Sequence, residues 1–220
     1  NVYIAGIMEH IEEAGIHSGD SACVLPPQTI SKQMETEIIR QTKIIAKELN
    51  VKGFMNIQFA IKDNELYILE VNPRGSRTIP FVAKATGLPL VKIAAQIMVG
   101  KKLKAFEIKN KQHNHVSVKE AVFPFSRFPG TDIILGPEMK STGEVMGIGE
   151  NFEIAFYKSQ IGANVSLPDS GNVFISVKNE DKSEIILFSK ILLELGFKII
   201  ATSGTSKTLE ENNIPSKKIK

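Results

Sequence analysis

The sequence has few of the features that mark secreted, membrane or nucleic-acid-binding proteins. It contains one cysteine, Cys23, so no internal disulfide is possible, and no apolar run approaches the roughly 20 residues of a membrane helix. The formal net charge is only +3, which gives no reason to expect nucleic acid or a membrane surface as a partner. No signal peptide is visible. We therefore expect a cytoplasmic protein in which Cys23 is a small buried hydrophobe.

The residues that are present predict an α/β protein of two units. The 220 residues, 42% of them hydrophobic, suffice for one or two cores. Apolar spacing and turn residues predict strands at 2–7 and 116–125, helices at 31–49, 78–86, 89–100 and 151–162, and a solvated connection at 101–115. The turn-rich residues 167–171 are the best linker, so the predicted units are 1–166 and 167–220.

The second predicted unit has the order of a parallel sheet. Its elements are a strand at 173–177, a helix at 182–195, a strand at 197–201 and a further helix opened by 202–206. We expect the lysine-rich residues 217–220 to be a solvated stub.

Residues 56–74 predict two short strands joined by a three-residue loop at 63–65. Apolar side chains of one parity share a face, namely Ile57, Phe59, Ile61, Tyr67, Leu69 and Val71. The loop places Gln58 opposite Glu70, with Asn72 on the same face. Leu66 and Ile68 also fall on that face and would partly cover it.

These three oxygen-bearing side chains suit a hard divalent cation that takes its other ligands from phosphate and water. Arg74 and Arg77 follow at once and could hold phosphate oxygens. The alternative is the solvated face of an ordinary amphipathic hairpin. The residues by themselves leave both interpretations open.

Several long motifs resemble the large subunit of the carbamoyl-phosphate synthase family. They cover nearly the whole chain and are Gly6–Glu12, Gly15–Ser21, Asn56–Phe59, Leu69–Arg77, Pro80–Gly87 and Gly136–Gly147. The family's subunit has two similar ATP-grasp halves. This chain resembles the second, because a segment similar to the family's regulatory domain of methylglyoxal-synthase fold follows. The resemblance implies an α+β ATP-grasp lobe, then the start of a Rossmann-like parallel α/β domain. Both chain ends are expected to be cuts through a longer protein.

By resemblance, the intact enzyme makes carbamoyl phosphate from bicarbonate, an ammonia donor and two ATP, for pyrimidine and arginine biosynthesis. This half would phosphorylate carbamate. The implied cofactors are ATP and two Mg²⁺ (or Mn²⁺) ions, one bound by Gln58 and Glu70 and the second by Glu70 and Asn72. Arg74, assisted by Arg77, would stabilise the transferred phosphoryl group. The implied partners are ATP, carbamate, a glutaminase small subunit and further copies in an oligomer.

The resemblance also assigns residues along the nucleotide and at effector sites. Those along the nucleotide are Gly15, Ile16, His17 and Ser18, together with Gln58 and Glu70, while Asn56 would position the acceptor. A lone histidine is more often structural, but the resemblance makes His17 a hydrogen-bonding contact and not a base. The implied effector residues are Glu12, Asp20 and Glu120 for a cation or amine, and Ser176, Lys182, Thr202 and Thr205 for a phosphorylated ligand.

The turn at 202–206 offers backbone N–H groups at a helix start, where an anion is favoured. Serine and threonine are also common helix caps, so the turn alone is a weak signal. Ser203 stands where the family has histidine, which leaves the identity of the effector open.

Two other interpretations remain. Another ATP-grasp ligase or carboxylase would share the hairpin but lack segments like 136–147 and 202–206. A non-catalytic binding module would have damaged ligands, whereas the residues of the hairpin are intact. In the family, the lobe with the phosphate-binding lysine and the lid precedes these motifs. We therefore expect little or no synthetase activity from the 220 residues alone.

Overall fold

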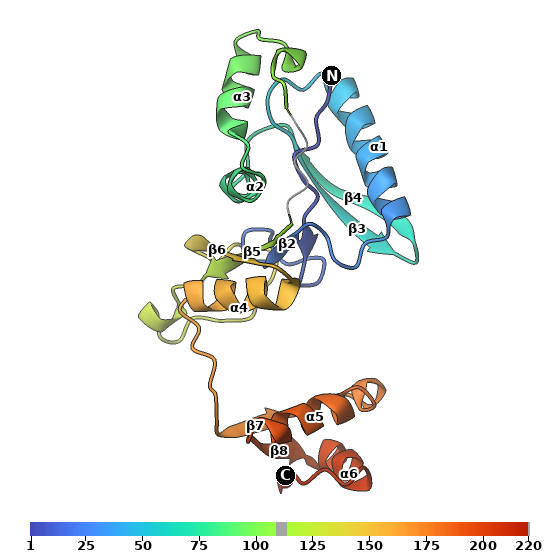
Figure 1. Ribbon diagram of the computed structural model, residues 1–220, viewed down its shortest axis with the longest axis vertical. Helices are drawn as coiled ribbons and strands as arrows, with labels where there is room; N and C mark the ends of the chain where they lie inside the picture. The colour runs from blue at the N-terminus through green and yellow to red at the C-terminus, as the bar shows by residue number, and fades with distance from the viewer. Residues whose placement is uncertain (109–113, 220) are drawn as a thin grey trace. The chain divides into compact units, whose positions relative to one another are not determined.

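The computed structural model describes residues 1–108 and 114–219. The chain divides into two compact units, Asn1–Val165 and Ser166–Lys220 (Figure 1). The predicted solvated connection at 101–115 includes 109–113, which lie outside the described residues. A 3₁₀ turn, η1 (Leu103–Ala105), occupies part of the remainder.

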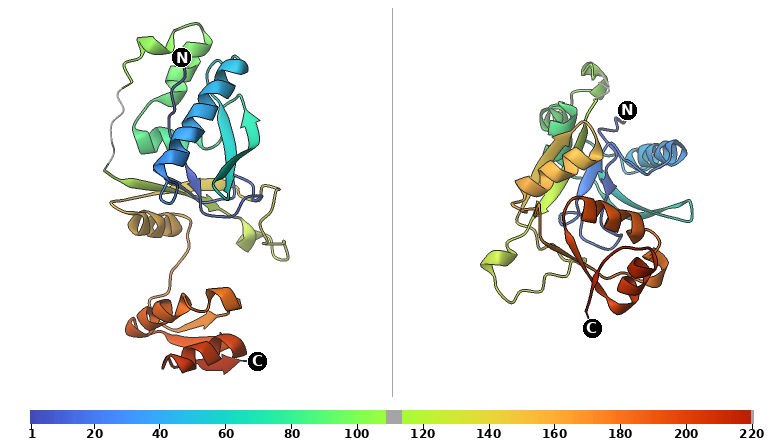
Figure 2. Two further views of the ribbon diagram at one scale, coloured as in Figure 1. Left: turned by 90° about the vertical axis from the view of Figure 1, so that its right-hand side faces the viewer. Right: turned by 60° about the horizontal axis from the view of Figure 1, so that its bottom comes forward.

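The first unit is built on a four-stranded antiparallel sheet. Its strands are β1 (Glu9–His10), β2 (Cys23–Leu25), β5 (Val116–Val122) and β6 (Gly143–Gly149), in the order β1-β2-β5-β6. Helix α4 (Phe152–Gly162) packs on one face, where Val24, Val118 and Ala155 form a buried cluster (Figure 2). Cys23 is fully buried, and burial raises the pKa of its thiol to about 12. The prediction of a buried, unreactive cysteine is confirmed.

The strand β5 ends three residues short of its predicted end. Val122 is its last residue, because Pro124 lacks an N–H to donate and opens a 3₁₀ turn, η2 (Phe125–Arg127). The long connection from there to β6 is tied to itself by Lys140, whose Nζ donates to the carbonyl oxygen of Asp132 at 2.9 Å.

A long helix and a two-stranded hairpin lie side by side in this unit (Figures 1 and 2). The helix α1 (Lys32–Glu48) begins at Ser31, whose Oγ accepts a hydrogen bond from the N–H of Met34 at 3.2 Å. The predicted helix at 31–49 is confirmed. The hairpin consists of β3 (Asn56–Lys62) and β4 (Glu65–Asn72), which pair with each other in a sheet of their own.

Two short helices follow the hairpin, as predicted. They are α2 (Ile79–Thr86) and α3 (Leu90–Met98). Gly87 ends α2 at a φ of 65°, the left-handed conformation that glycine adopts without strain. Phe81, Val82 and Leu90 form the buried cluster of this part. No single described helix is long and apolar enough to cross a membrane; α2 and α3 reach that size only together, with a bend of 117° between them.

The predicted strand at 2–7 is wrong. The structure assigns no strand there, and β1 is limited to two residues. Ala5 and Met8 pack instead against the buried cluster of α2 and α3. A sequence with strand propensity forms a strand only where a neighbouring backbone supplies its hydrogen bonds. Among the described strands, none pairs with 2–7.

The second unit is a three-stranded parallel sheet with two helices. Its strands, β7 (Asn172–Ile175), β8 (Lys198–Thr202) and β9 (Lys217–Ile219), pair in that order, and its helices are α5 (Ile185–Glu194), α6 (Ser203–Glu211) and a 3₁₀ turn, η3 (Asn179–Asp181). The predicted β–α–β–α order is confirmed. The predicted stub is corrected, because residues 217–219 pair with β8 although their side chains are exposed. Lys220 lies outside the described residues.

Gly147→Ala should destabilise the first unit by about 3 kcal/mol or more. A Cβ at Gly147 would lie 2.0 Å from the carbonyl oxygen of Ala155 and 2.5 Å from the backbone nitrogen of Ser159, both in α4. Gly143→Ala on the same strand is the matched control, since its Cβ would lie 3.7 Å from its nearest neighbour. Urea unfolding followed by circular dichroism measures both. Equal stability of the two variants would contradict the close approach of β6 and α4.

Candidate functional site

The candidate site lies at the open end of the β3–β4 hairpin. Antiparallel pairing sets Gln58 opposite Glu70 and Asn56 opposite Asn72. Asn72 Nδ2 donates a hydrogen bond to Glu70 Oε1 at 2.7 Å, which leaves the amide oxygen of Asn72 available to a ligand. The structure therefore brings the three predicted oxygen-bearing side chains together.

The turn of the hairpin differs from the prediction, and a bulge compensates for the difference. The loop has two residues, Asp63 and Asn64, both at positive φ (53° and 62°), as a type I′ turn requires. This shorter loop alone would set Gln58 opposite Leu69. A register shift beside Gln58 leaves Leu69 as an extra, bulged residue and brings Glu70 opposite Gln58.

The bulge also changes which side chains share a face. Leu66 and Ile68 pair with residues of the apolar face, whereas Tyr67 pairs on the face of Gln58. The predicted placement of these three side chains is therefore wrong. Glu70 is exposed, so the face with the oxygen ligands is open to a ligand from solvent.

The donor set fits a hard divalent cation. One carboxylate and two amide oxygens are suitable ligands for Mg²⁺, which fills its other positions with phosphate and water. The described residues hold no group of three or more His, Cys, Asp or Glu that could bind a metal. An ion at the hairpin would therefore depend on Gln58 and Asn72 as much as on Glu70. Arg74 begins directly beside them, since its N–H donates to the carbonyl oxygen of Asn72 at 2.8 Å.

The segment Gly15–Ser18 is held by backbone contacts around His17. The N–H of His17 donates to the carbonyl oxygen of Gly136 at 2.8 Å, and its Nδ1 accepts from the N–H of Gly19 at 3.0 Å. A ring nitrogen that accepts a hydrogen bond carries no proton, so the neutral imidazole has its proton on Nε2. His17 thus offers a ligand a hydrogen-bond donor.

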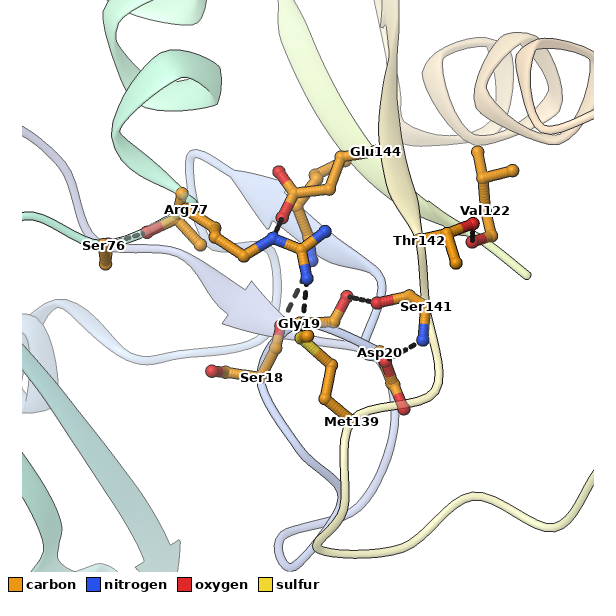
Figure 3. Close-up of polar contacts among 12 residues, drawn as sticks. Ser18, Gly19, Asp20, Ser76, Arg77, Val122, Met139, Ser141, Thr142 and Glu144 are labelled. Carbon is orange, nitrogen blue, oxygen red and sulfur yellow. Dashed lines mark hydrogen bonds and ion pairs between the residues drawn. The ribbon is translucent and has the colours of Figure 1, made fainter. Parts of the chain in front are cut away.

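A buried aspartate joins this segment to Gly136–Gly147 (Figure 3). Asp20 is 0% exposed, and its oxygens accept from the N–H groups of Lys140 at 2.7 Å and Ser141 at 2.9 Å. Burial acts to raise the pKa of Asp20, but the hydrogen bonds from Ser141 and Lys140 outweigh it and hold the pKa below its ordinary value. Its carboxylate is a clamp on the backbone in this structure, and its effector role stays a prediction.

Arg77 contacts two side chains of the Gly136–Gly147 segment (Figure 3). Its Nε stands 3.6 Å from Glu144 Oε1 on β6, and its Nη1 contacts the sulfur of Met139. That Glu144 oxygen is buried without a hydrogen-bond partner in the described chain, so Arg77 supplies its nearest opposite charge. No role of Glu144 is predictable from the sequence, because one carboxylate in a glycine-rich strand gives no signal of its partner.

The other two predicted effector acids share one neighbourhood. Glu12 accepts from the N–H of Ala22 at 2.6 Å, and Glu120 accepts from Gln160 Nε2 at 2.5 Å. Burial raises the pKa of Glu120, the N–H of Ala121 opposes the rise, and the charge of Glu12 adds to it. The two carboxylates therefore lie close enough to repel each other, a condition that a bound cation would relieve.

In the second unit, the four predicted effector residues converge on the start of α6. Thr202 Oγ1 lies 3.3 Å from both Ser176 Oγ and Thr205 Oγ1, within hydrogen-bond distance of each hydroxyl. A Cβ built on Gly204 would lie 3.0 Å from Lys182 Nζ, so this ammonium stands over the first turn. A lysine beside the free N–H groups of a helix start is suited to an anion.

Known protein families match part of each unit. A family model described as "Carbamoyl-phosphate synthase L chain, ATP binding domain" matches residues 1–106, and one described as "MGS-like domain" matches 184–220. The carbamoyl phosphate synthase large chain of Mesorhizobium japonicum is 56% identical over 223 residues, which cover 99% of this chain and 19% of that protein. The C-terminal section of the large chain from Methanocaldococcus jannaschii is 52% identical over 227 residues, covering 98% and 37%.

Among solved structures, the phosphoribosylglycinamide synthetase from Anaerococcus prevotii aligns with a TM-score of 0.52 at 13% identity, over 68% of this chain and 50% of that one. This is a likeness of fold alone.

The fold of the first unit and its matched ATP-binding domain define an ATP-grasp protein. Identities of 52% and 56% over nearly the whole chain then specify which one: the chain belongs to the carbamoyl phosphate synthase large-chain family. It spans 19% of the length of the Mesorhizobium relative.

Asp20→Asn should lower the free energy of unfolding of the first unit by about 2 kcal/mol at neutral pH, the worth of a hydrogen bond to a charged group. Because the folded-state pKa of Asp20 is depressed, its contribution is present above the unfolded-state pKa of about 4 and is lost as pH falls through the lower folded-state pKa. The difference between wild type and variant should therefore shrink below about pH 4.

Asp132→Asn is the matched control for this prediction. Asp132 lies on the same connection, but it is exposed and faces Lys140 at 3.6 Å, so its loss should change stability little. Urea unfolding of both variants across the acid range measures the effect. A pH-independent difference for Asp20→Asn, or an equal loss for Asp132→Asn, would show that the buried carboxylate is not the clamp.

Proposed function

We propose that this chain contributes the site at which ATP phosphorylates carbamate in a carbamoyl phosphate synthase. The observation that carries the proposal is the pairing of Gln58 with Glu70, beside Asn72, on the open face of the hairpin. Membership of the large-chain family supports it. Because the chain spans 19% of its Mesorhizobium relative, the activity is proposed for the complete protein.

Gln58 and Glu70 would hold one Mg²⁺ or Mn²⁺ ion, and Glu70 with Asn72 a second. Such ions neutralise the charge of the ATP β- and γ-phosphates during phosphoryl transfer. Glu70 would serve both ions because it is the one carboxylate of the three. The hydrogen bond from Asn72 Nδ2 fixes both side chains relative to each other before a ligand arrives.

The two arginines would act on the transferred phosphoryl group. Arg74 would hold its oxygens and stabilise the negative charge that builds on them. Arg77 would assist, because a guanidinium has five N–H donors and the ion pair of its Nε with Glu144 does not exhaust them. Asn56, opposite Asn72, would position carbamate. No general base is required, since carbamate already carries a nucleophilic oxygen.

The segment Gly15–Ser18 would lie along the nucleotide. His17 would donate from Nε2, the ring position that its contact with Gly19 leaves protonated. The N–H of His17 is already held by Gly136, so little ordering of the segment would be needed on binding.

We also propose that the second unit binds a phosphorylated effector, at Ser176, Lys182, Thr202 and Thr205. The convergence of these residues on the start of α6 supports this assignment. A cation or amine effector is proposed near Glu12, Asp20 and Glu120. The glutaminase small subunit, the oligomer and the two biosynthetic pathways are proposed from the family alone.

Glu70→Gln should weaken Mn²⁺ binding in the presence of ADP at least about 10-fold. Mutation of a residue that only supports a metal ligand already lowers metal affinity about 10- to 100-fold, and Glu70 is a proposed ligand itself. Electron paramagnetic resonance of the free ion measures the affinity in the 220-residue chain. Glu65→Gln is the control on the same strand, at the turn end of the hairpin, where Glu65 accepts from the hydroxyl of Tyr67 at 2.6 Å. If both variants bind Mn²⁺ like the wild type, the hairpin is not the metal site.

The 220 residues alone should show little or no carbamate-dependent ADP release, because an ATP-grasp site is enclosed by two lobes and these motifs belong to one. The reverse reaction, ATP synthesis from carbamoyl phosphate and ADP, should be equally slow. The same sequence grafted into the Mesorhizobium japonicum large chain, in place of its aligned segment, should turn over. Robust turnover by the 220 residues alone would refute this expectation.

A further inference from the structure

Lys119 is a fully buried lysine in the middle of β5. The structure pairs it with Cys23 of β2 and Met146 of β6, and its exposed fraction is 0%. Within the described residues, its Nζ has one hydrogen-bond acceptor, the carbonyl oxygen of Ser18 at 3.1 Å. An ammonium is costly to bury unless nearby groups compensate for the lost water.

The charge of Lys119 is balanced on the sheet face that α4 does not cover. Its neighbour Val118 belongs to the α4 cluster, so Lys119 faces the opposite way. Burial raises the pKa of the adjacent Cys23 thiol, the positive charge of Lys119 opposes the rise, and three carboxylates add to it: Glu12, Glu120 and Glu144. The Nζ of Lys119 therefore lies in a buried neighbourhood that is rich in carboxylates.

The peptide between Ser18 and Gly19 connects this ammonium to His17. The C=O and N–H of a trans peptide lie in one plane and point in opposite directions. Lys119 holds the carbonyl end at 3.1 Å, and the N–H end donates to His17 Nδ1 at 3.0 Å. The contact with Lys119 and the contact with His17 Nδ1 thus lie at the two ends of one rigid peptide unit.

Other contacts of the segment act on neighbouring peptide units. The N–H of His17 is bound by Gly136, and the carbonyl oxygen of Gly19 accepts from Ser141 Oγ at 3.1 Å. The carboxylate of Asp20 clamps the Gly136–Gly147 segment. None of these three contacts involves the Ser18–Gly19 peptide.

We propose that Lys119 is a positioning residue for the nucleotide contact, which orients His17 through the Ser18–Gly19 peptide so that the imidazole presents its Nε2–H to the ligand. The inference rests on the proposed function, which assigns Gly15–Ser18 to the nucleotide. Lys119 itself does not touch the ligand. Its hydrogen bond is partly shielded from water, where a charged donor holds a carbonyl more firmly than at a fully exposed surface.

Lys119→Met tests this, because methionine has a similar length and no ammonium. Replacing a buried charge by an apolar group can raise or lower stability, so unfolding does not decide. The deciding signals are the ring ¹⁵N shifts of His17, one of four histidines, and the amide exchange of Gly19. The wild type should show the Nε2–H tautomer. In the variant, a mixture of tautomers and an exchange rate at least about 10-fold faster are expected from the loss of a charged hydrogen bond.

Affinity for MgADP should fall about 10-fold in the same variant, as the oriented donor is lost. Lys158→Met is the matched control, since Lys158 Nζ also donates to a backbone carbonyl of this sheet, that of Ile148 at 2.9 Å. This contact does not involve the segment Gly15–Ser18. It should leave the His17 signals and the MgADP affinity unchanged. Lys119→Gln keeps a hydrogen-bond donor on a shorter side chain. Its His17 shifts, Gly19 exchange rate and MgADP affinity should lie between those of the wild type and of Lys119→Met. This variant replaces Lys119→Met if the methionine variant does not fold.

Wild-type His17 signals and Gly19 exchange in Lys119→Met would overturn the inference, as would equal effects of Lys158→Met. Failure of the unchanged chain to bind MgADP would instead contradict the assignment of Gly15–Ser18 to the nucleotide, which belongs to the proposed function. The His17 signals need no nucleotide, so they decide the positioning role in either case.

Discussion

The pairing of Gln58 with Glu70 is the constraint on which the proposed chemistry depends. It results from two local features acting together, a two-residue turn and a bulge at Leu69. A one-residue slip in a hairpin moves every side chain to the other face, so loss of the bulge would turn Glu70 and Asn72 together away from Gln58. The bulge therefore decides whether three weak oxygen ligands act as one site.

Two buried carboxylates hold other segments of the candidate site in place. Asp20 clamps the backbone at Lys140 and Ser141, and Glu144 faces Arg77 at 3.6 Å. These contacts join segments that lie far apart in the sequence. Because each is at least partly shielded from water, each stabilises its segment more than a surface ion pair does, and each is more costly to lose.

Local signals in the sequence were sufficient for most of the fold. The helices were predicted well, because caps such as Ser31 and Gly87 mark helix ends by chemistry that acts within three residues. The strand expected at 2–7 fails because strand formation needs a partner that a local pattern does not contain.

The candidate site was predictable only in part. The opposition of Gln58 and Glu70 was expected from a three-residue loop, and the structure reaches it by a shorter loop and a bulge, which the pattern does not reveal. The contact of Lys119 spans 101 positions and the clamp of Asp20 spans 121 to Ser141. The one visible signal was a lysine in a strand that also contains three valines.

The central claim is that Gln58, Glu70 and Asn72 bind a divalent ion beneath a nucleotide, and paramagnetic broadening tests it most directly. Mn²⁺ would be titrated with ADP into the ¹⁵N-labelled chain while the side-chain amide signals of Gln58 and Asn72 are followed. These signals should broaden first, and that of Asn64 at the far turn should persist. Equal broadening along the hairpin, or first broadening elsewhere in the chain, would contradict the account.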